Sequence, residues 1–327
     1  MSAPRIVVLD SFAIDQGEPD STWRELAALG ELAVYPRTER AEVIERAGDD
    51  TLALLTNKVP LGAAELAALP ALRYVGVTAT GTDIIDLEAA RARGVAVTNV
   101  PGYATESVAE LVFAHILHFS YDVAGHNAAV KAGVWAASSD FCFFRQPLVE
   151  LAGKTLVLVG AGAIGGAVAR IGEAFGMRVV RAAVPGAPTR DGETRTPLAE
   201  ALPRADFVSL HCPLTAATRG LVGAEFLAAL KPGAILINTG RGALIDDAAL
   251  AAALARGQLG GAGLDVLDAE PPPPSHPLTD PRTPWAGRIV NTPHIGWGTV
   301  ESRRRLVSEV ARNLAAFLQG QARNRVV

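Results

Sequence analysis

Cysteine is scarce in this chain. Only two of its 327 residues are cysteine, Cys142 and Cys212. Two such cysteines provide neither a disulfide framework nor the closely spaced ligands of a structural metal site. We therefore expect no metal centre, and we expect the protein to reside in a reducing cytoplasm.

The chain also lacks an excess of positive charge. Its 30 Lys and Arg residues are outnumbered by 34 Asp and Glu residues, for a formal net charge of −4. Proteins that bind nucleic acid or anionic membranes usually carry a basic surface, so we expect neither partner. The basic run Arg303-Arg304-Arg305 lies in a helical pattern and is interpreted as a solvated helix face.

Long apolar runs are missing as well. The segment 155–169 is uncharged, but it is too short and too rich in glycine to span a bilayer. The N-terminus opens like a strand and lacks the basic and apolar regions of a signal peptide. The 49% of hydrophobic residues is typical of a globular protein with a sizeable core, and the length suffices for two domains.

Short β-rich runs alternate with helical patterns along most of the chain. The runs expected as strands are 5–9, 32–35, 52–55, 73–77 and 95–98, and then 156–159, 178–181, 207–210, 235–238, 263–265 and 288–291. Such alternation is typical of parallel sheets that helices cover on both faces. The predicted fold class is therefore α/β, with two doubly wound parallel-sheet domains.

A glycine-rich turn follows the strand 156–159. Its sequence is Gly160-Ala161-Gly162-Ala163-Ile164-Gly165. In such a turn the first glycine permits the bend, the second lets the backbone approach a pyrophosphate, and the third lets helix and strand pack closely. The N-terminus of the following helix offers free N–H groups to the phosphates. Glycines also serve purely structural turns, but a strand before and a helix after favour a dinucleotide site.

A helical excursion without strands separates the two alternating regions. It runs from about 105 to 121, resumes around 125–133, and ends in the aromatic loop 141–144. The apolar surface of this excursion, about 105–150, would be hard to bury within one chain, which predicts a homodimer. Near the C-terminus, the amphipathic pattern 302–318 is expected to return to the first α/β region, which has no evident closing helices of its own.

Polar residues stand where ligands of a doubly wound sheet bind, beyond the carboxyl ends of the strands. Arg241 follows the strand 235–238, Glu270 precedes a proline run, and His294 follows the strand 288–291. A single Arg or Glu in a loop is usually surface charge, and a single His is more often structural. Their convergence on the edge that carries the glycine turn favours a functional site.

These three side chain types form a chemical set. Arginine binds a carboxylate through two hydrogen bonds. Histidine passes a proton to or from an oxygen near neutral pH, and a neighbouring carboxylate favours its charged form and fixes its orientation. Opposite a nicotinamide, the set suffices to reduce a 2-oxo acid to a 2-hydroxy acid.

Several motifs resemble those of the D-isomer-specific 2-hydroxyacid dehydrogenase family, nearly from end to end. They are the glycine turn, Asn238-Thr239-Gly240-Arg241-Gly242, Gly263-Leu264-Asp265-Val266, Glu270-Pro271-Pro272 and Thr292-Pro293-His294-Ile295. The segments Thr56-Asn57-Lys58, Asn99-Val100-Pro101-Gly102-Tyr103 and Asp140-Phe141-Cys142-Phe143 are similar to the glycerate dehydrogenase branch, whose members also act as hydroxypyruvate or glyoxylate reductases. The resemblance implies a Rossmann-type nucleotide-binding domain, 100–292, inserted into a flavodoxin-like substrate-binding domain, 1–99 with 293–327.

The resemblance also implies roles for individual residues. Arg241 would bind the substrate carboxylate, His294 would be the acid/base, and Glu270 its partner. Lys58, Thr80 and Gly81 would contact the substrate, although Lys58 is equally interpretable as a solvated lysine. The residues implied in cofactor binding are Gly160, Gly162, Ala163, Ile164, Gly165, Thr105, Cys212, Pro213, Thr218, Thr239, Gly240 and Asp265.

Three positions depart from the family pattern. Ala163 replaces the Arg or His that often contacts a phosphate, and Gly240 replaces a common alanine. Ala183 stands where an NAD enzyme usually has an Asp for the ribose hydroxyls. Without that carboxylate a 2′-phosphate is not repelled, and Arg181, Arg190 or Arg195 could attract it. The next acidic residues, Asp191 and Glu193, lie several positions further along the chain. The cofactor is NAD(H) or NADP(H), and we favour NADP(H) or dual use.

The leading hypothesis is an enzyme that transfers a hydride between NAD(P)H and a small 2-oxo acid, such as hydroxypyruvate or glyoxylate, giving a D-2-hydroxy acid. One alternative is a nucleotide-sensing binding protein on the same scaffold, like the C-terminal binding protein corepressors, because fold alone does not separate the two. Another is a degenerate enzyme with weak cofactor binding, suggested by Ala163 and Ala183.

Overall fold

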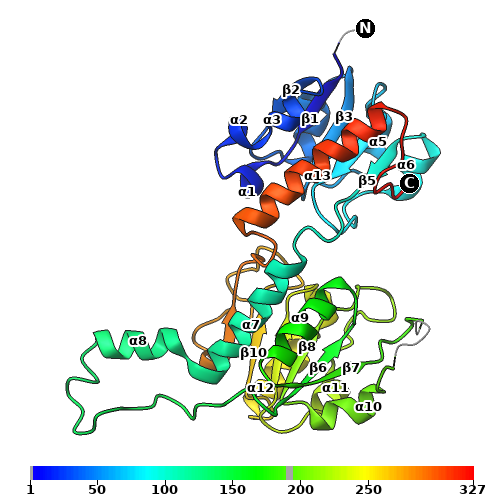
Figure 1. The fold of residues 1–327 in the computed structure, drawn as a ribbon. Coiled ribbons are helices and arrows are strands. Elements are labelled where there is room, and N and C mark those ends of the chain that lie inside the picture. Colours follow the sequence, from blue (N-terminus) through cyan, green and yellow to red (C-terminus); the bar gives the residue numbers. More distant parts are fainter. Residues whose placement is uncertain (1–2, 189–193) are drawn as a thin grey trace. The chain divides into compact units, whose positions relative to one another are not determined.

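Two compact units make up the chain, which the computed structural model describes over residues 3–188 and 194–327. Unit 1 comprises Met1–Ala104 and Trp297–Val327, and unit 2 comprises Thr105–Gly296. The domain boundaries predicted from the sequence lie between residues 99 and 100 and between residues 292 and 293. Each unit holds one sheet whose strand pairs are all parallel, which confirms the predicted class of two doubly wound α/β domains (Figure 1).

The sheet of unit 1 has the strand order β2-β1-β3-β4-β5. Its strands are β1 (Arg5–Val8), β2 (Glu31–Val34), β3 (Thr51–Thr56), β4 (Tyr74–Val77) and β5 (Ala96–Thr98). This is the flavodoxin-like order, in which the chain reverses direction across the sheet between β1 and β3. The carboxyl ends of β1, β3 and β4 consequently share one edge.

Helices of unit 1 are short except for the last. They are α1 (Phe12–Asp15), α2 (Pro19–Thr22), α3 (Arg24–Ala27), the 3-10 turn η1 (Arg40–Glu42), α4 (Val43–Ala47), α5 (Ala63–Ala68), α6 (Leu87–Ala92) and α13 (Val300–Leu318). The C-terminal α13 lies against β4, where the rings of Phe317 and Tyr74 are 5.0 Å apart. Its buried stripe closes a face of this sheet.

The sheet of unit 2 has the strand order β11-β10-β9-β8-β6-β7. Its strands are β6 (Thr155–Val159), β7 (Arg178–Ala182), β8 (Phe207–Leu210), β9 (Ile235–Asn238), β10 (Gly261–Leu264) and β11 (Ile289–Asn291). A parallel bridge from Ala182 to Thr196 extends the edge beyond β7. The strand order reverses between β6 and β8, and a Rossmann-type sheet binds its ligand at such a reversal.

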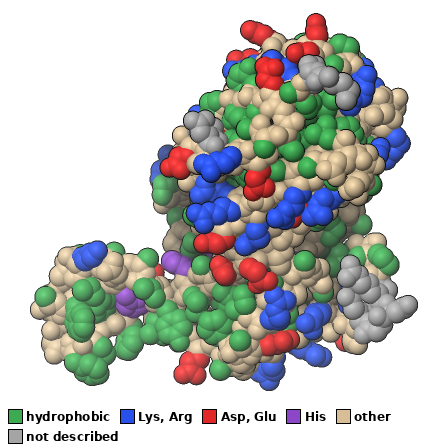
Figure 2. All heavy atoms as spheres, turned by 45° about the horizontal axis from the view of Figure 1, so that its top comes forward, with side chains coloured by type: hydrophobic (Ala, Val, Ile, Leu, Met, Phe, Trp, Pro, Cys, Tyr) green, Lys and Arg blue, Asp and Glu red, His purple; other side chains and the backbone are tan. Residues whose placement is uncertain are grey.

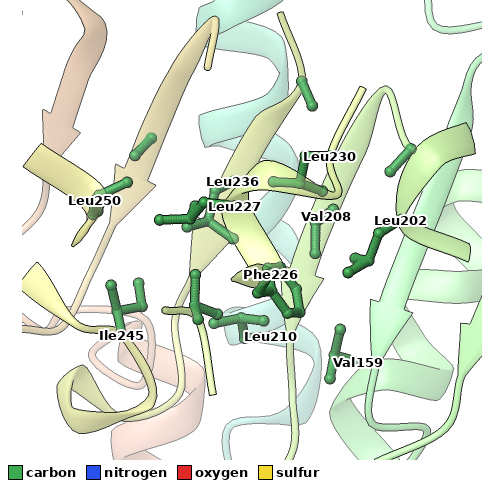
Figure 3. Packing of buried hydrophobic residues seen from close by; sticks show 14 of the residues in the cluster. Val159, Leu202, Val208, Leu210, Phe226, Leu227, Leu230, Leu236, Ile245 and Leu250 are labelled. Carbon is green, nitrogen blue, oxygen red and sulfur yellow. The ribbon is translucent and has the colours of Figure 1, made fainter. Parts of the chain in front are cut away.

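Helices cover both faces of this sheet. They are α7 (Thr105–Tyr121), α8 (Val123–Lys131), α9 (Ala163–Ala174), α10 (Leu198–Ala201), α11 (Ala224–Ala228) and α12 (Asp247–Ala255), with the 3-10 turns η2 (Leu202–Arg204), η3 (Gly242–Leu244) and η4 (Ala286–Arg288). α7 and α9 pack together on one face. On the other face, Leu210 and Leu236 pack with Phe226 and Leu250 (Figure 3). None of the helices within residues 3–188 and 194–327 is long and apolar enough to cross a membrane.

Candidate active site

The glycine turn after β6 has the geometry of a phosphate cradle. Gly160 has φ +107°, and a Cβ there would lie 2.6 Å from the backbone of His211 and Cys212. A Cβ on Gly165 would lie 2.2 Å from the carbonyl oxygen of Gly160. Gly162, which caps α9, has nothing within 4 Å of such an atom. The first and third glycines are thus required by the fold, whereas the second leaves open space for a pyrophosphate.

The first turn of α9 contains Ala163 and Ile164 and no acidic residue. Neither side chain can neutralise a phosphate, so a phosphate bound at this turn would be met by backbone N–H groups and the dipole of α9. The residues present therefore fit a dinucleotide, with fewer charged contacts than the family pattern provides.

The end of β7 is where the sequence predicts a contact with an adenine ribose. The N–H of Ala183 donates to the carbonyl of Thr196 at 2.8 Å, and the N–H of Thr196 donates to the carbonyl of Arg181 at 2.9 Å. No side chain carboxylate extends from position 183. The Arg181 side chain is 43% exposed and lies 3.8 Å from Glu173, while Arg195 belongs to the same edge. Arg190, Asp191 and Glu193 lie outside the described residues.

The loop after β9 holds Arg241 by its backbone. Asn238 donates to the carbonyl of Arg241 at 2.9 Å and accepts from the N–H of Gly240 at 3.0 Å. Arg241 is half-buried, and its guanidinium donates to the carbonyl of Gly240 at 3.0 Å. A Cβ on Gly240 would meet its neighbours at an ordinary 3.5 Å. An alanine, which is common at this position in the family, would thus fit as well as the glycine of this chain.

Gly242 brings the Arg241 loop against the loop that carries Glu270. A Cβ on Gly242 would lie 1.9 Å from the backbone carbon of Leu267, so only glycine permits this approach. Beside it, the hydroxyl of Thr239 is buried and has no hydrogen-bond partner among the described residues. A buried hydroxyl in that state is suited to a ligand contact.

His294 and Glu270 form a close pair in unit 2. Nδ1 of His294 lies 2.6 Å from Oε2 of Glu270, whose Oε1 accepts from the N–H of Leu267 at 3.1 Å. The side chains are 28% and 32% exposed, so both remain accessible to a small molecule. Because Glu270 pairs with Nδ1, the other ring nitrogen, Nε2, is the one that faces away from this pair.

The backbone at His294 is unusual, with φ +53°. Its N–H donates to the carbonyls of Asp265 and Thr292, at 2.8 and 3.0 Å. Residues other than glycine hold this left-handed conformation only where their surroundings fix it, and such residues cluster at functional sites.

Asp265 organises the loop around His294. The residue is 2% exposed, and its carboxylate accepts from the hydroxyl of Thr292 and the N–H groups of Ile295 and Gly296, at 2.6, 2.9 and 2.8 Å. Sequence reasoning expected a cofactor contact from Asp265 and did not anticipate this internal role. The cofactor contact stays a prediction.

His115 was missed by the sequence analysis. It lies on α7, is 2% exposed, and its Nε2 is 3.2 Å from the Thr292 hydroxyl. A signal was present, because His115 interrupts the apolar positions Val112 and Ile116 that face the sheet. Its partner, 177 residues further along the chain, was not readable from that signal.

The turn after β8 contains three further predicted cofactor residues. The hydroxyl of Thr218 donates to the carbonyl of Pro213 at 2.7 Å and accepts from the N–H of Thr215 at 2.8 Å, so it fixes the turn. Cys212 is buried, and burial raises the pKa of its thiol. The backbone here touches Gly160, which places the turn beside the phosphate cradle.

The predicted substrate residues Lys58, Thr80 and Gly81 belong to unit 1, in loops that follow β3 and β4. The half-buried Asp10 accepts from the N–H groups of Asn57 and Lys58 at 2.8 and 2.5 Å, and desolvation raises its pKa. Thr80 donates to the carbonyl of Val100 at 2.9 Å. Thr105, implied in cofactor binding, is instead the first residue of α7 in unit 2.

The chain has clear relatives among known proteins. Residues 113–296 match the family model of the "D-isomer specific 2-hydroxyacid dehydrogenase, NAD binding domain". The chain belongs to the D-isomer-specific 2-hydroxyacid dehydrogenase family.

Members of this family align with nearly the whole length of the chain. A hydroxypyruvate reductase from Blautia hydrogenotrophica is 39% identical over 325 residues, 98% of each chain. A glycerate dehydrogenase from Methylorubrum extorquens is 38% identical over 312 residues, 95% of this chain and 96% of the relative. A crystal structure of the NADPH-dependent glyoxylate/hydroxypyruvate reductase from Sinorhizobium meliloti, with NADP and malonate, has a TM-score of 0.82 and 31% identity, covering 100% and 97% of the two chains.

The dehydrogenase thus has two sets of candidate site residues. Unit 2 brings together the Arg241 loop, Glu270 and His294, with the glycine turn on the same sheet. Unit 1 carries Lys58, Thr80 and Gly81 on the edge of its own sheet. Within residues 3–188 and 194–327, no three His, Cys, Asp or Glu side chains are grouped as ligands of a metal ion.

Proposed function

We propose that this chain, an NAD(P)-dependent oxidoreductase of its family, reduces a small 2-oxo acid of the hydroxypyruvate or glyoxylate kind to the D-2-hydroxy acid. The observation that carries the proposal is the pair of His294 and Glu270, 2.6 Å apart, beside the loop of Arg241. Relatives named hydroxypyruvate reductase, glycerate dehydrogenase and glyoxylate reductase support this substrate class.

The chain's own residues divide the remaining work. A bound NAD(P)H supplies the hydride. The Arg241 guanidinium binds the substrate carboxylate through two hydrogen bonds and so fixes the 2-oxo group. Nε2 of His294 donates a proton to the carbonyl oxygen as charge develops there. Glu270, held by the Leu267 N–H, keeps the ring oriented through its contact with Nδ1.

The test is an assay of 2-oxo acids of increasing side chain size, each with NADH and with NADPH. We expect turnover that is highest with hydroxypyruvate or glyoxylate. Tight nucleotide binding with no turnover of any acid would instead point to the nucleotide-sensing alternative, which none of the relatives named above supports. Turnover accompanied by weak binding of both nucleotides would indicate a degenerate enzyme.

We propose further that the enzyme uses NADP(H), or both cofactors. Position 183 carries no carboxylate to repel a 2′-phosphate, and its N–H is engaged by Thr196. The exposed Arg181 on the same strand offers positive charge. The NADPH-dependent relative from Sinorhizobium meliloti supports the choice.

A homodimer in the cytoplasm completes the proposal. The arm 122–148, which comprises α8 and its return segment, extends from its own sheet (Figure 1) and carries many exposed apolar side chains (Figure 2). Their exposed fractions include 89% for Phe141, 72% for Val123, 68% for Phe144 and 51% for Trp135. Trp135 donates to the carbonyl of Phe141 and Arg145 pairs with Asp122, so the arm is held in shape. A second copy would cover this surface.

A further inference from the structure

His115 is a buried histidine that the proposed reaction does not use. Burial lowers its pKa, which favours the neutral ring. The ring lies against Gly263 of β10, where a Cβ would come within 2.8 Å of Cγ and Nδ1 of His115. Glycine at 263 therefore makes the room that the ring occupies, in the strand that Asp265 directly follows.

Two consecutive hydrogen bonds connect this ring to the active-site loop. The hydroxyl of Thr292 donates to Oδ1 of Asp265 at 2.6 Å. Since a threonine hydroxyl has one hydrogen, the same oxygen must accept from Nε2 of His115, 3.2 Å away. The neutral ring consequently carries its proton on Nε2.

Asp265 in turn fixes the backbone of His294 and of the two residues after it. Its carbonyl accepts from the N–H of His294, and its carboxylate accepts from the N–H groups of the two following residues. These bonds stabilise the left-handed backbone at His294, a conformation that costs free energy in a residue that carries a side chain.

We propose that His115 is a positioning residue, whose hydrogen bond to Thr292 orients the Thr292–Asp265 pair that holds the His294 turn in place. The inference rests on the proposed function, since it assigns the acid/base role to His294. A histidine that only filled space would be replaceable by leucine, whereas a positioning donor is replaceable by glutamine, whose side chain N–H reaches a similar point.

The experiment compares His115→Leu with His115→Gln in the full chain. Because misplacing a catalytic group lowers turnover more than binding, we expect His115→Leu to lower kcat about tenfold. KM for the 2-oxo acid and Kd for NAD(P)H should change by less than about twofold, since Arg241 and the glycine turn are untouched. His115→Gln should recover most of the kcat. Equal losses in both variants, or no loss in His115→Leu, would overturn the proposal.

Amide hydrogen exchange over 292–296 tests the same link without catalysis. We expect the N–H groups of Ile295 and Gly296 to exchange faster in His115→Leu and at the wild-type rate in His115→Gln. Unchanged exchange in His115→Leu would refute the positioning role whatever the activity. If wild-type protein reduces no 2-oxo acid and exchange still responds as expected, the proposed function fails and the link stands.

A variant of the middle residue covers the case in which His115→Leu does not fold. Thr292→Val removes the hydroxyl and keeps the volume, so it should show the same loss of kcat as His115→Leu. The combination of Thr292→Val with His115→Gln should be no worse than Thr292→Val alone, because the two residues act through one link. Additive losses would contradict the proposal.

Discussion

At the residue scale, the planar fork of Arg241 is what distinguishes it from another cation. The loop bonds of Asn238 and Gly240 fix its backbone, so a substitution at 241 changes only the side chain. Arg241→Lys keeps the charge and loses one of two hydrogen bonds to a carboxylate, so we expect kcat/KM to fall about a hundredfold. Steady-state kinetics with hydroxypyruvate check this. Unchanged kinetics would mean that Arg241 does not bind the carboxylate.

The acid/base role of His294 should be visible in the pH dependence. Reduction requires the protonated ring of His294 and so falls as pH rises, whereas oxidation requires the neutral ring and rises over the same range. Glu270→Gln retains a hydrogen bond at Nδ1 but replaces the charged acceptor with a weaker neutral one, so kcat should fall while the opposite trends of the two directions remain. The profiles of kcat/KM in both directions measure both effects.

His294→Ala is the control for that experiment. It should lower kcat by several orders of magnitude, on the order of 10²–10⁴ for a lost acid/base, with little change in cofactor affinity. Superimposable pH profiles for wild type and His294→Ala would rule out the mechanism.

The side chain at position 183 is expected to influence which cofactor the enzyme prefers. Ala183→Asp adds a carboxylate that can accept bonds from the ribose hydroxyls and repels a 2′-phosphate, so preference should shift towards NADH by about tenfold or more. The ratio of kcat/KM for NADH and NADPH measures this, with Ala183→Asn as the uncharged control. A wild-type preference for NADH of about a hundredfold would contradict the electrostatic interpretation of this strand end.

At the scale of elements, one buried carboxylate joins η1 to α5. Glu65 accepts from Nε and Nη2 of Arg40 at 2.7 and 3.1 Å and from the N–H of Gly62 at 2.9 Å. The hydrogen bond from Arg40 lowers the pKa of Glu65 to about 2. A folded-state pKa below the unfolded value stabilises the protein fully above pH 4.5 and progressively less as pH falls towards 2.

Glu65→Gln should therefore destabilise unit 1 at pH 7 by about 1.5–3 kcal/mol, as expected for a charge-assisted hydrogen bond. The difference from wild type should shrink at pH 3. Urea unfolding at both pH values measures it. Glu31→Gln, whose side chain is 71% exposed beside Arg5, is the matched control and should have little effect. An equal difference at both pH values would contradict the linkage.

At the scale of the whole molecule, the arm 122–148 predicts the oligomeric state. Wild-type protein should sediment as a dimer at micromolar concentration, because Phe141 and Phe144 leave too much apolar surface uncovered in a monomer. The double variant Phe141→Asp, Phe144→Asp should sediment as a monomer. Ile44 is also apolar and 45% exposed, but it lies outside the arm. The control variant Ile44→Asp should therefore remain dimeric. A wild-type monomer would contradict the proposal.

Much of the architecture was readable from local patterns. Apolar runs such as β6 and β8 predict buried parallel strands, because both faces of such a strand meet helices. The packing around Trp23 was not readable in this way. The buried Trp23 lies between the short helices α2 and α3, and its ring N–H donates to Asp15 at 3.0 Å. This contact depends on a neighbouring turn rather than on local periodicity.

The sequence by itself determined the α/β class, the glycine turn and the family, because strand burial, turn conformation and motif spacing are properties of neighbouring residues. Tertiary structure decided which distant groups meet. Gly242 lets the Arg241 and Glu270 loops touch, and Asp265 joins Thr292 to the turn at His294. These contacts depend on how separate strands end at one edge of a sheet, and no local pattern encodes the distance between two loops.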